Sequence, residues 1–159
     1  MRYFFFGTLM DPDVRALVIG GPAPALRIAP ATLAGFRRVY VAGRSYPMLI
    51  SDALGRVEGC LVRGLDGCAR ARIGQFEGIE YRPERHRVRL SDGTRVEAWV
   101  FMARSGVRAS ETPWVLSTWQ RRQKRAFLGR ARMCSGPDAP KQLLPPREGK
   151  SGRRVRSGG

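Results

Sequence analysis

The sequence has few of the side chains that bind metals or carry out redox chemistry. Its 159 residues include one histidine, His86, and three cysteines, Cys60, Cys68 and Cys134. The cysteine spacings match no zinc-binding pattern, and an odd number does not indicate a disulfide framework. We therefore expect reduced thiols, no metal site and no cofactor. A Ser-His-Asp triad would depend on His86 alone, which we interpret instead as a hydrogen-bonded, half-buried strand residue.

Long apolar runs are also missing. No stretch reaches the roughly 20 apolar residues that a transmembrane helix requires. The opening residues 1–6, which are apolar except for Arg2, stop at Gly7 and are followed by Asp11, with no small-residue cleavage site. They therefore predict a strand rather than a signal peptide. The expectation is a soluble, cytoplasmic protein with no membrane partner.

Acidic residues are scarce relative to basic ones. The chain has 13 Asp and Glu against 29 Lys and Arg, a formal net charge of +16, and 12 of the basic but only two of the acidic residues lie from Arg121 onward. The basic run Arg121–Arg125 and the Arg-rich C-terminus keep open a nucleic-acid-binding module. No nucleic-acid recognition motif supports it, a charged helix face is usually just solvated, and the preference for Arg over Lys also fits genome composition.

The remaining composition fits one domain, with 43% hydrophobic and 26% charged residues. Beyond Gly136 the chain consists largely of Pro, Gly, Ser and Arg, which cannot form a packed core. We predict a domain over residues 1–135 and a flexible basic tail over 136–159. Oligomeric state is not indicated by the sequence.

Local patterns predict a mixture of strands and helices. Asp11 and Pro12 are typical of a helix start and Gly20 of a helix end, Asp66 can cap a second helix, and Thr112-Pro113 can open a third. The stretch 23–30 looks like a proline-rich loop. Strands are predicted at 2–6, 32–41, 47–50 and 57–63 and in a hairpin over 85–102, and helices at 12–19, 67–76 and 113–133. This order predicts an α+β domain built on a small curved sheet or barrel.

The first candidate site is Phe6-Gly7-Thr8-Leu9, directly after the first predicted strand. Because Gly7 has no side chain, the N–H groups of this loop can turn toward a ligand. Such groups beside a helix N-terminus bind carboxylates or a developing oxyanion. The alternative is an ordinary strand-to-helix turn. The loop lacks the other glycines and the lysine of a Walker loop, so it does not indicate nucleotide binding.

The second candidate site is Phe76-Glu77-Gly78, at the end of a predicted helix. A carboxylate between an aromatic residue and a glycine can be shielded from water, which raises its pKa and suits it to act as a general base. The alternative is a solvated Glu77 with Gly78 ending the helix. Glu80 is a rival base, and we prefer Glu77 because Gly78 adjoins it.

Taken in order, these segments resemble the gamma-glutamylcyclotransferase-like family, closest to its AIG2-like and gamma-glutamylamine cyclotransferase branches. The resemblance covers residues 2–104, and the helix from Trp114 to Phe127 is similar to the helical extension of some bacterial members. The motifs that carry it are Phe6-Gly7-Thr8-Leu9, Ser45-Tyr46-Pro47-Met48, Val57-x-Gly59-x-Leu61 and Phe76-Glu77-Gly78-x-x-Tyr81-Arg82.

The resemblance implies a small mixed β-barrel with peripheral helices that needs no cofactor. It also implies an activity, the cyclisation of a γ-glutamyl group to 5-oxoproline with release of the amine. The family's catalytic Glu falls on Glu77, and its loop that holds the γ-glutamyl group falls on Phe6, Gly7, Thr8 and Leu9.

Two positions depart from the family pattern. The usual Tyr of the loop is Phe6, and the usual Leu-Asp pair before the catalytic Glu is Ile73-Gly74. A catalytically silent member that keeps the pocket for ligand binding is therefore an alternative. Tyr81 and Arg82 are further candidates to line the pocket, although Arg82 equally suits a solvated surface.

Overall fold

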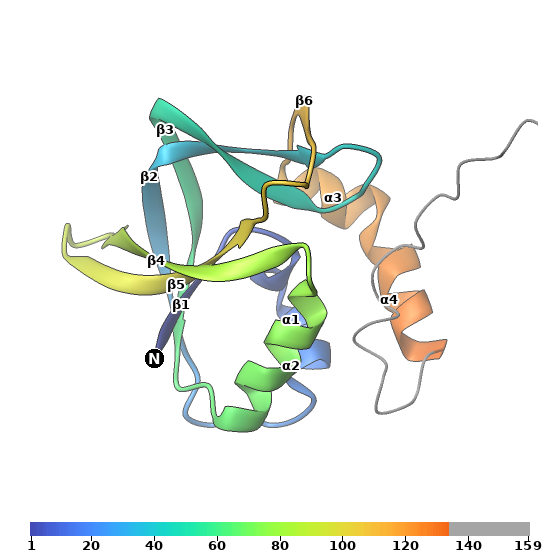
Figure 1. The fold of residues 1–159 in the computed structure, drawn as a ribbon. Coiled ribbons are helices and arrows are strands. Elements are labelled where there is room, and N and C mark those ends of the chain that lie inside the picture. Colours follow the sequence, from blue (N-terminus) through green and yellow to red (C-terminus); the bar gives the residue numbers. More distant parts are fainter. Residues whose placement is uncertain (134–159) are drawn as a thin grey trace, which may run out of the picture.

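The computed structural model describes residues 1–133, which form a β-barrel with helices packed on its outside (Figure 1). The predicted tail, Cys134 and the predicted domain boundary at residue 135 lie outside the described residues. In chain order the elements are β1 (Arg2–Phe5), a short 3₁₀ helix (Thr8–Met10), α1 (Pro12–Ile19), β2 (Arg27–Val41), β3 (Pro47–Arg63), α2 (Gly67–Glu77), β4 (Tyr81–Leu90), β5 (Arg95–Ala103), β6 (Ala109–Pro113), α3 (Leu116–Arg122) and α4 (Lys124–Met133).

The barrel closes through β1 to β5. The strand order is β3-β1-β5-β4-β2, and a long antiparallel ladder between β2 and β3 joins the two ends. The pairing of β1 with β5 is parallel, whereas the other barrel pairings are antiparallel, and β6 adds to the outside of β2. Two of the pairings that complete the barrel are short: β1 meets β5 at Tyr3 and Trp99, and β2 meets β4 through Ala31 and Thr32.

The first strand separates two hydrophobic cores. Side chains alternate along a strand, so Phe4 points into the barrel interior while Tyr3 and Phe5 point toward the helices. Residues 3–6 are all at most 7% exposed, which agrees with the continuous apolar pattern of the sequence. The strand therefore anchors the loop that follows it from both sides.

Helices α1 and α2 begin at the predicted residues; α1 ends as predicted at Ile19, and α2 runs one residue further than predicted, to Glu77. Asp11 caps α1 by accepting hydrogen bonds from the N–H groups of Asp13 and Val14, and Gly20 ends the helix in a left-handed conformation. Asp66 caps α2 by accepting a 2.7 Å hydrogen bond from the N–H of Ala69. In the described part of the chain, no helix has the length and apolar character needed to span a bilayer.

Three expectations about elements are wrong in detail. Residues 27–30 belong to β2 rather than to a loop, because they pair with the end of β3, Pro30 opposite Cys60. The segments 47–50 and 57–63 are parts of one strand, whose residues 52–55 have no partner on β2. The pairing passes from Arg56 opposite Ala34 to Ser51 opposite Phe36, with only Gly35, at φ +87°, between them on β2. The predicted helix 113–133 is two helices, α3 and α4.

The C-terminal helices start later than Thr112-Pro113 suggested. Residues 109–113 extend β2 as strand β6, which places Trp114 against the barrel before α3 begins at Leu116. The helical path breaks at Gln123. Trp114, Trp119 and Phe127 are at most 6% exposed, as expected for helices that dock on the barrel.

The C-terminal helices are attached to the start of α1 through a buried carboxylate. One oxygen of Asp11, Oδ2, accepts hydrogen bonds of 2.8 Å from Gln120 and from Lys124, and Lys124 also pairs with Asp13 at 2.6 Å. Burial favours a higher pKa for Asp11, but its hydrogen bonds from Lys124, Gln120 and the N–H of Val14 outweigh burial and lower the pKa. Asp11 is therefore a charged anchor that joins the two ends of the described chain.

Candidate active site

A small pocket lies where the end of β1, the end of α2 and the C-terminal helices meet. Its volume is about 50 Å³, several times the space that one water molecule needs, so it suits a small polar group rather than a nucleotide. The lining residues are Phe4, Phe5, Phe6, Gly7, Thr8, Leu9, Ser45, Tyr46, Pro47, Phe76, Glu77, Tyr81, Phe101, Trp119 and Phe127. Of the residues predicted for the site, the pocket brings together Phe6, Gly7, Thr8, Leu9, Phe76, Glu77 and Tyr81, whereas Gly78, Glu80 and Arg82 are outside the lining.

The loop after β1 lines this pocket with Gly7, Thr8 and Leu9. Gly7 precedes a 3₁₀ helix whose first closing hydrogen bond runs from the N–H of Met10 to the carbonyl of Gly7. The N–H groups of Thr8 and Leu9 consequently have no partner within that helix. A side chain at position 7 would meet Pro47, since a Cβ there would lie 3.0 Å from its Cγ. Glycine therefore lets the loop lie close to the segment around Pro47.

Arg38, which the sequence did not single out as a functional residue, holds the loop in place through hydrogen bonds to backbone carbonyls. Nη1 of Arg38 donates to the carbonyl of Phe6 at 2.6 Å and to that of Glu58 at 3.1 Å, and Nε donates to the carbonyl of Trp114 at 3.1 Å. Its guanidinium also lies 5.1 Å from the centre of the Trp114 ring. Burial lowers the pKa of Arg38, against the opposing effect of the Glu58 carboxylate. The sequence signal was an arginine inside a strand, which by itself indicates no partner.

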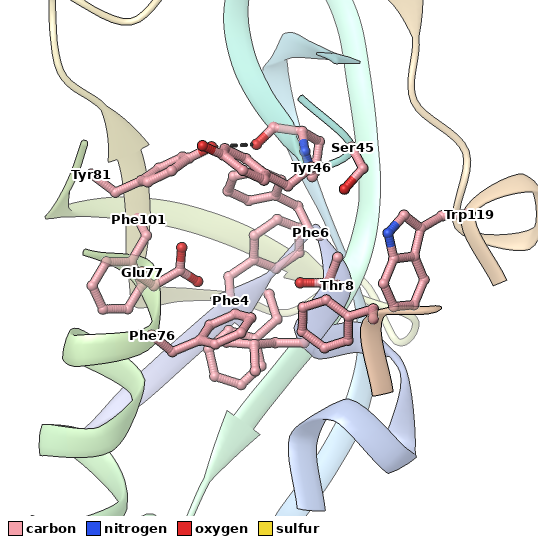
Figure 2. A pocket seen from close by; sticks show the side chains of 15 residues that line it. Phe4, Phe6, Thr8, Ser45, Tyr46, Phe76, Glu77, Tyr81, Phe101 and Trp119 are labelled. Atoms are coloured by element: carbon pink, nitrogen blue, oxygen red, sulfur yellow. Dashed lines mark hydrogen bonds between the residues drawn. The ribbon is translucent and has the colours of Figure 1, made fainter. Parts of the chain in front are cut away.

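Glu77 is the last residue of α2, and its carboxylate points into the pocket among phenylalanine rings (Figure 2). The helix ends here because Gly78, with φ +70°, turns the chain away. Burial raises the pKa of Glu77 from 4.5 to about 8. The charged form is therefore disfavoured, and the carboxylate has a high affinity for a proton.

The segment 45–47 forms the wall above Glu77 and is held by three side chains. Trp114 Nε1 donates to the carbonyl of Ser45 at 3.0 Å, the Tyr81 hydroxyl donates to the carbonyl of Pro47 at 2.8 Å, and the Tyr46 hydroxyl donates to Glu80 at 2.7 Å. Burial raises the pKa of Tyr81, and the nearby charges of Glu77, Tyr46 and Glu80 raise it further. Tyr81 accordingly stays protonated and keeps its donor role.

The structure separates the two rival carboxylates. Glu77 lines the pocket, whereas Glu80 is outside the lining and accepts the Tyr46 hydrogen bond. Arg82 is also outside it, exposed and 2.9 Å from Glu84. His86 is half-buried as expected, but its Nε2 makes no hydrogen bond within the described residues.

The remaining predicted groups lie away from the pocket. Cys60 is buried in the core and Cys68 is exposed. No group of three or more His, Cys, Asp or Glu side chains that could hold a metal ion occurs in residues 1–133. In the basic run, Arg121, Arg122 and Arg125 are exposed, while Lys124 is occupied by the two carboxylates at the start of α1.

The arrangement therefore places a carboxylate with a raised pKa and a loop of backbone donors around one cavity. A base and donors so arranged can deprotonate an amine and stabilise charge on a carbonyl oxygen. Apart from Glu77, the lining has no charged side chain. The pocket is thus suited to a substrate that brings its own ammonium group to the carboxylate.

Comparisons with known proteins agree with the resemblance seen in the sequence. The family model described as gamma-glutamyl cyclotransferase, AIG2-like, matches residues 3–121. AIG2-like protein C of Arabidopsis thaliana is 26% identical over 128 residues, 79% of this chain and 72% of that protein. A solution structure from Arabidopsis thaliana has 26% identity and a TM-score of 0.60, covering 80% of this chain and 85% of that one. A structure of a gamma-glutamyl cyclotransferase aligns over 93% of this chain and 89% of the other with a TM-score of 0.59; at 12% identity it supports the fold alone. The predicted mixed barrel is confirmed, and the chain belongs to the AIG2-like gamma-glutamyl cyclotransferase family.

Proposed function

We propose that this protein converts γ-glutamyl amines or short γ-glutamyl peptides to 5-oxoproline and a free amine, with Glu77 as the general base. The observation that carries the proposal is that Glu77 and the loop Gly7-Thr8-Leu9 line the same small cavity. Membership of the AIG2-like family supports the reaction class.

In the proposed reaction, the neutral α-amino nitrogen of the substrate attacks its own γ-carbonyl carbon. A new N–C bond closes the five-membered ring, the C–N bond to the departing amine breaks, and one proton moves from the attacking to the leaving nitrogen. Glu77 accepts that proton and returns it, so the atoms balance without a co-substrate. Because the attack is intramolecular, the protein mainly holds a folded conformer with the reacting atoms about 3–3.5 Å apart.

The backbone donors complete this proposal. The N–H groups of Thr8 and Leu9 are available to the substrate's α-carboxylate or to the oxyanion that develops on the γ-carbonyl. Phe6 replaces the usual tyrosine of the loop and is 6% exposed in the pocket wall, so it contributes shape rather than a hydroxyl contact. Tyr81 contributes by positioning Pro47 in the pocket wall, because its hydroxyl donates a hydrogen bond to the Pro47 carbonyl.

The test is to incubate the full chain with a panel of γ-glutamyl amines and dipeptides and to quantify both products. We expect 5-oxoproline and free amine in equal amounts from at least one substrate. Tight binding of a γ-glutamyl compound without product would instead identify a catalytically silent ligand-binding member. Product formation that survives loss of every lining polar group would contradict the assignment of this pocket.

The nucleic-acid hypothesis from the sequence stays a separate prediction. It rests on the 12 basic residues from Arg121 onward, half of which lie outside the described part of the chain. Removing residues 136–159 and measuring the salt dependence of oligonucleotide binding distinguishes it, since phosphate contacts make binding fall steeply with salt. A flat salt response in the full chain would exclude it.

A further inference from the structure

The outer face of the β4–β5 hairpin carries a group of exposed arginines. Side chains alternate along a strand, so Arg85, Arg87 and Arg89 of β4 point to the outside of the barrel, while Val88 between them is buried in its interior. Arg95 of β5 lies directly opposite Arg89. All four arginines are exposed, and Figure 1 shows the hairpin on the side of the barrel away from α3 and α4. This positive face is separate from the pocket that holds Glu77.

One part of the face is a hollow of about 300 Å³ that four of the arginines line. Two small side chains of β2, Thr32 and Ala34, lie between the neighbouring strands, with Arg56 of β3 opposite Ala34 and Arg89 of β4 opposite Thr32. The lining residues are Thr32, Ala34, Arg56, Arg87, Val88, Arg89 and Arg95. The lining thus contains no acidic side chain, and none of its arginines forms an ion pair within residues 1–133.

The charges in this hollow repel one another. Arg89 and Arg95 are direct cross-strand partners, and like charges in that position destabilise a sheet. The partner of Arg89 on its other side, Thr32, is neutral. An anion bound in the hollow would remove the repulsion, because it supplies the negative charge that the surrounding strands lack.

A second hollow, of about 490 Å³, continues the positive face toward β1. Its lining includes Arg2, Arg63 and Arg85, with Glu97 and Trp99. Arg2 and Arg63 are again direct cross-strand partners of like charge. The Arg85 guanidinium lies 5.5 Å from the centre of the Trp99 ring and 3.9 Å from Glu97. The second hollow is therefore also net positive, and it adds an aromatic ring.

The spacing of the charges suits a chain of phosphates better than a single anion. Residues two apart on a strand lie about 6.6–6.8 Å apart, and a stacked nucleic-acid strand carries a phosphate about every 3.4 Å. Arg85, Arg87 and Arg89 therefore match every second phosphate along such a strand. Arg85 and Arg87 line one hollow each, so a strand bound along β4 passes from one hollow to the other. Guanidinium groups pair with phosphate in a bidentate manner, and Trp99 offers a ring on which a base can stack.

We propose that the outer face of the β4–β5 hairpin binds single-stranded nucleic acid. We call the lining of the two hollows the arginine face. This binding activity is independent of the proposed cyclotransferase reaction, because the arginine face shares no residue with the pocket lining. It is also independent of the basic residues from Arg121 onward.

The test measures binding of the full chain to a fluorescent oligo(dT) of about 16 nucleotides, the upper end of the site sizes seen on OB-fold barrels. Replacing Arg89 and Arg95 together by glutamine should raise Kd about tenfold at physiological salt. It should also reduce the slope of log affinity against log salt concentration by about 1.4, the effect of losing two phosphate contacts to a single strand. Replacing both by lysine, which keeps the charge but not the bidentate geometry, should give an intermediate Kd.

The matched control is the double variant Arg121→Gln/Arg122→Gln, which removes the same charge from an exposed pair on α3. Charges beyond the Debye length are largely screened, so its Kd should stay within about twofold of the unaltered chain. Thermal unfolding should show Arg89→Gln/Arg95→Gln to be at least as stable as the unaltered chain, since the change relieves repulsion. Its 5-oxoproline formation, measured separately, should not change.

Four outcomes would overturn the inference. The first is that the unaltered chain does not bind oligo(dT). The second is an equal loss of affinity in the Arg89/Arg95 and Arg121/Arg122 glutamine variants, which would show that binding follows net charge alone. The third is that poly-glutamate of equal charge binds as tightly as oligo(dT), which would identify a surface for acidic polypeptides. The fourth is that phosphatidylserine vesicles bind in place of oligo(dT), which would identify a lipid-binding face.

Discussion

Glu77→Gln is expected to lower 5-oxoproline formation by about 10²–10⁴-fold, the range typical of losing a general base. The amide has nearly the same shape as the carboxylate but cannot accept the proton from the substrate's amino group. The pocket walls contributed by Phe76, Phe101 and Tyr81 should keep their packing. Steady-state kinetics with any substrate that the protein turns over measures the loss.

The same substitution is expected to stabilise the folded protein. The pKa of Glu77 is about 8 in the folded protein against 4.5 when exposed, so the folded state binds an extra proton between these pH values. The free energy of unfolding therefore falls as the pH rises from about 4.5 to 8. Above pH 8 the stability lost by ionising Glu77 is complete and no longer changes with pH. Each pKa unit corresponds to 1.36 kcal/mol of free energy of unfolding, and water that enters the open pocket makes the real cost smaller than this conversion gives. Glu77→Gln should therefore raise the free energy of unfolding by about 2–4 kcal/mol at pH 9.

Denaturant unfolding at pH 5 and pH 9 checks this pH-dependent stability. The gain from Glu77→Gln should be small at pH 5 and large at pH 9, because the native carboxyl is already neutral at the lower pH. Glu80→Gln is the matched control, since the same chemical change occurs outside the pocket lining and the Tyr46 hydroxyl can still donate to the amide oxygen. Equal losses of activity in the two variants, or no gain in stability at pH 9, would contradict the assignment of Glu77.

Gly59→Ala is expected to destabilise the barrel by about 3 kcal/mol or more, at the upper end of overpacking effects. Gly59 lies in β3 beside β1, and an added Cβ would collide with the carbonyl oxygen of Phe5 and lie 2.6 Å from Cζ of Phe4. A backbone oxygen cannot rotate away as a flexible side chain can, so β1 has to shift. Since β1 leads directly into Gly7 and Thr8, activity should fall together with stability.

Gly74→Ala is the matched comparison for this effect. Gly74 lies in α2, is exposed, and has no neighbouring atom within 4 Å of an added Cβ. Alanine there should stabilise the helix by about 0.5–1 kcal/mol because glycine loses more backbone entropy on folding. Chemical denaturation of both variants measures the contrast, and a change of less than 1 kcal/mol for Gly59→Ala would show that β1 and β3 do not pack as described.

Local sequence signals predicted the elements around the site well. Asp11 and Asp66 mark helix starts, Gly20 and Gly78 mark helix ends, and the alternating residues on either side of the turn 91–94 form the β4–β5 hairpin. These features depend on neighbours within a few residues, which is why the sequence reveals them. The closed barrel required the family resemblance, because periodicity alone cannot show which strands pair.

Long-range contacts escaped prediction. Arg38 reaches Phe6 and Trp114 across 32 and 76 positions of the chain, and Lys124 reaches Asp11 from the opposite end of the domain. No local pattern distinguishes these side chains from the many solvated basic residues. The start of the C-terminal helices was misplaced for the same reason, since Pro113 suits both a helix start and the strand β6 that pairs with distant β2.

The proposed function depends on a Glu77 carboxyl that is partly shielded from water in the pocket it shares with Gly7, Thr8 and Leu9. Carbon-13 NMR of the glutamate side-chain carboxyls, with the Glu77 signal assigned by its absence in Glu77→Gln, measures its titration without any substrate. We predict a titration midpoint near pH 8. A midpoint between about 4 and 5, the range of an exposed glutamate, would contradict it.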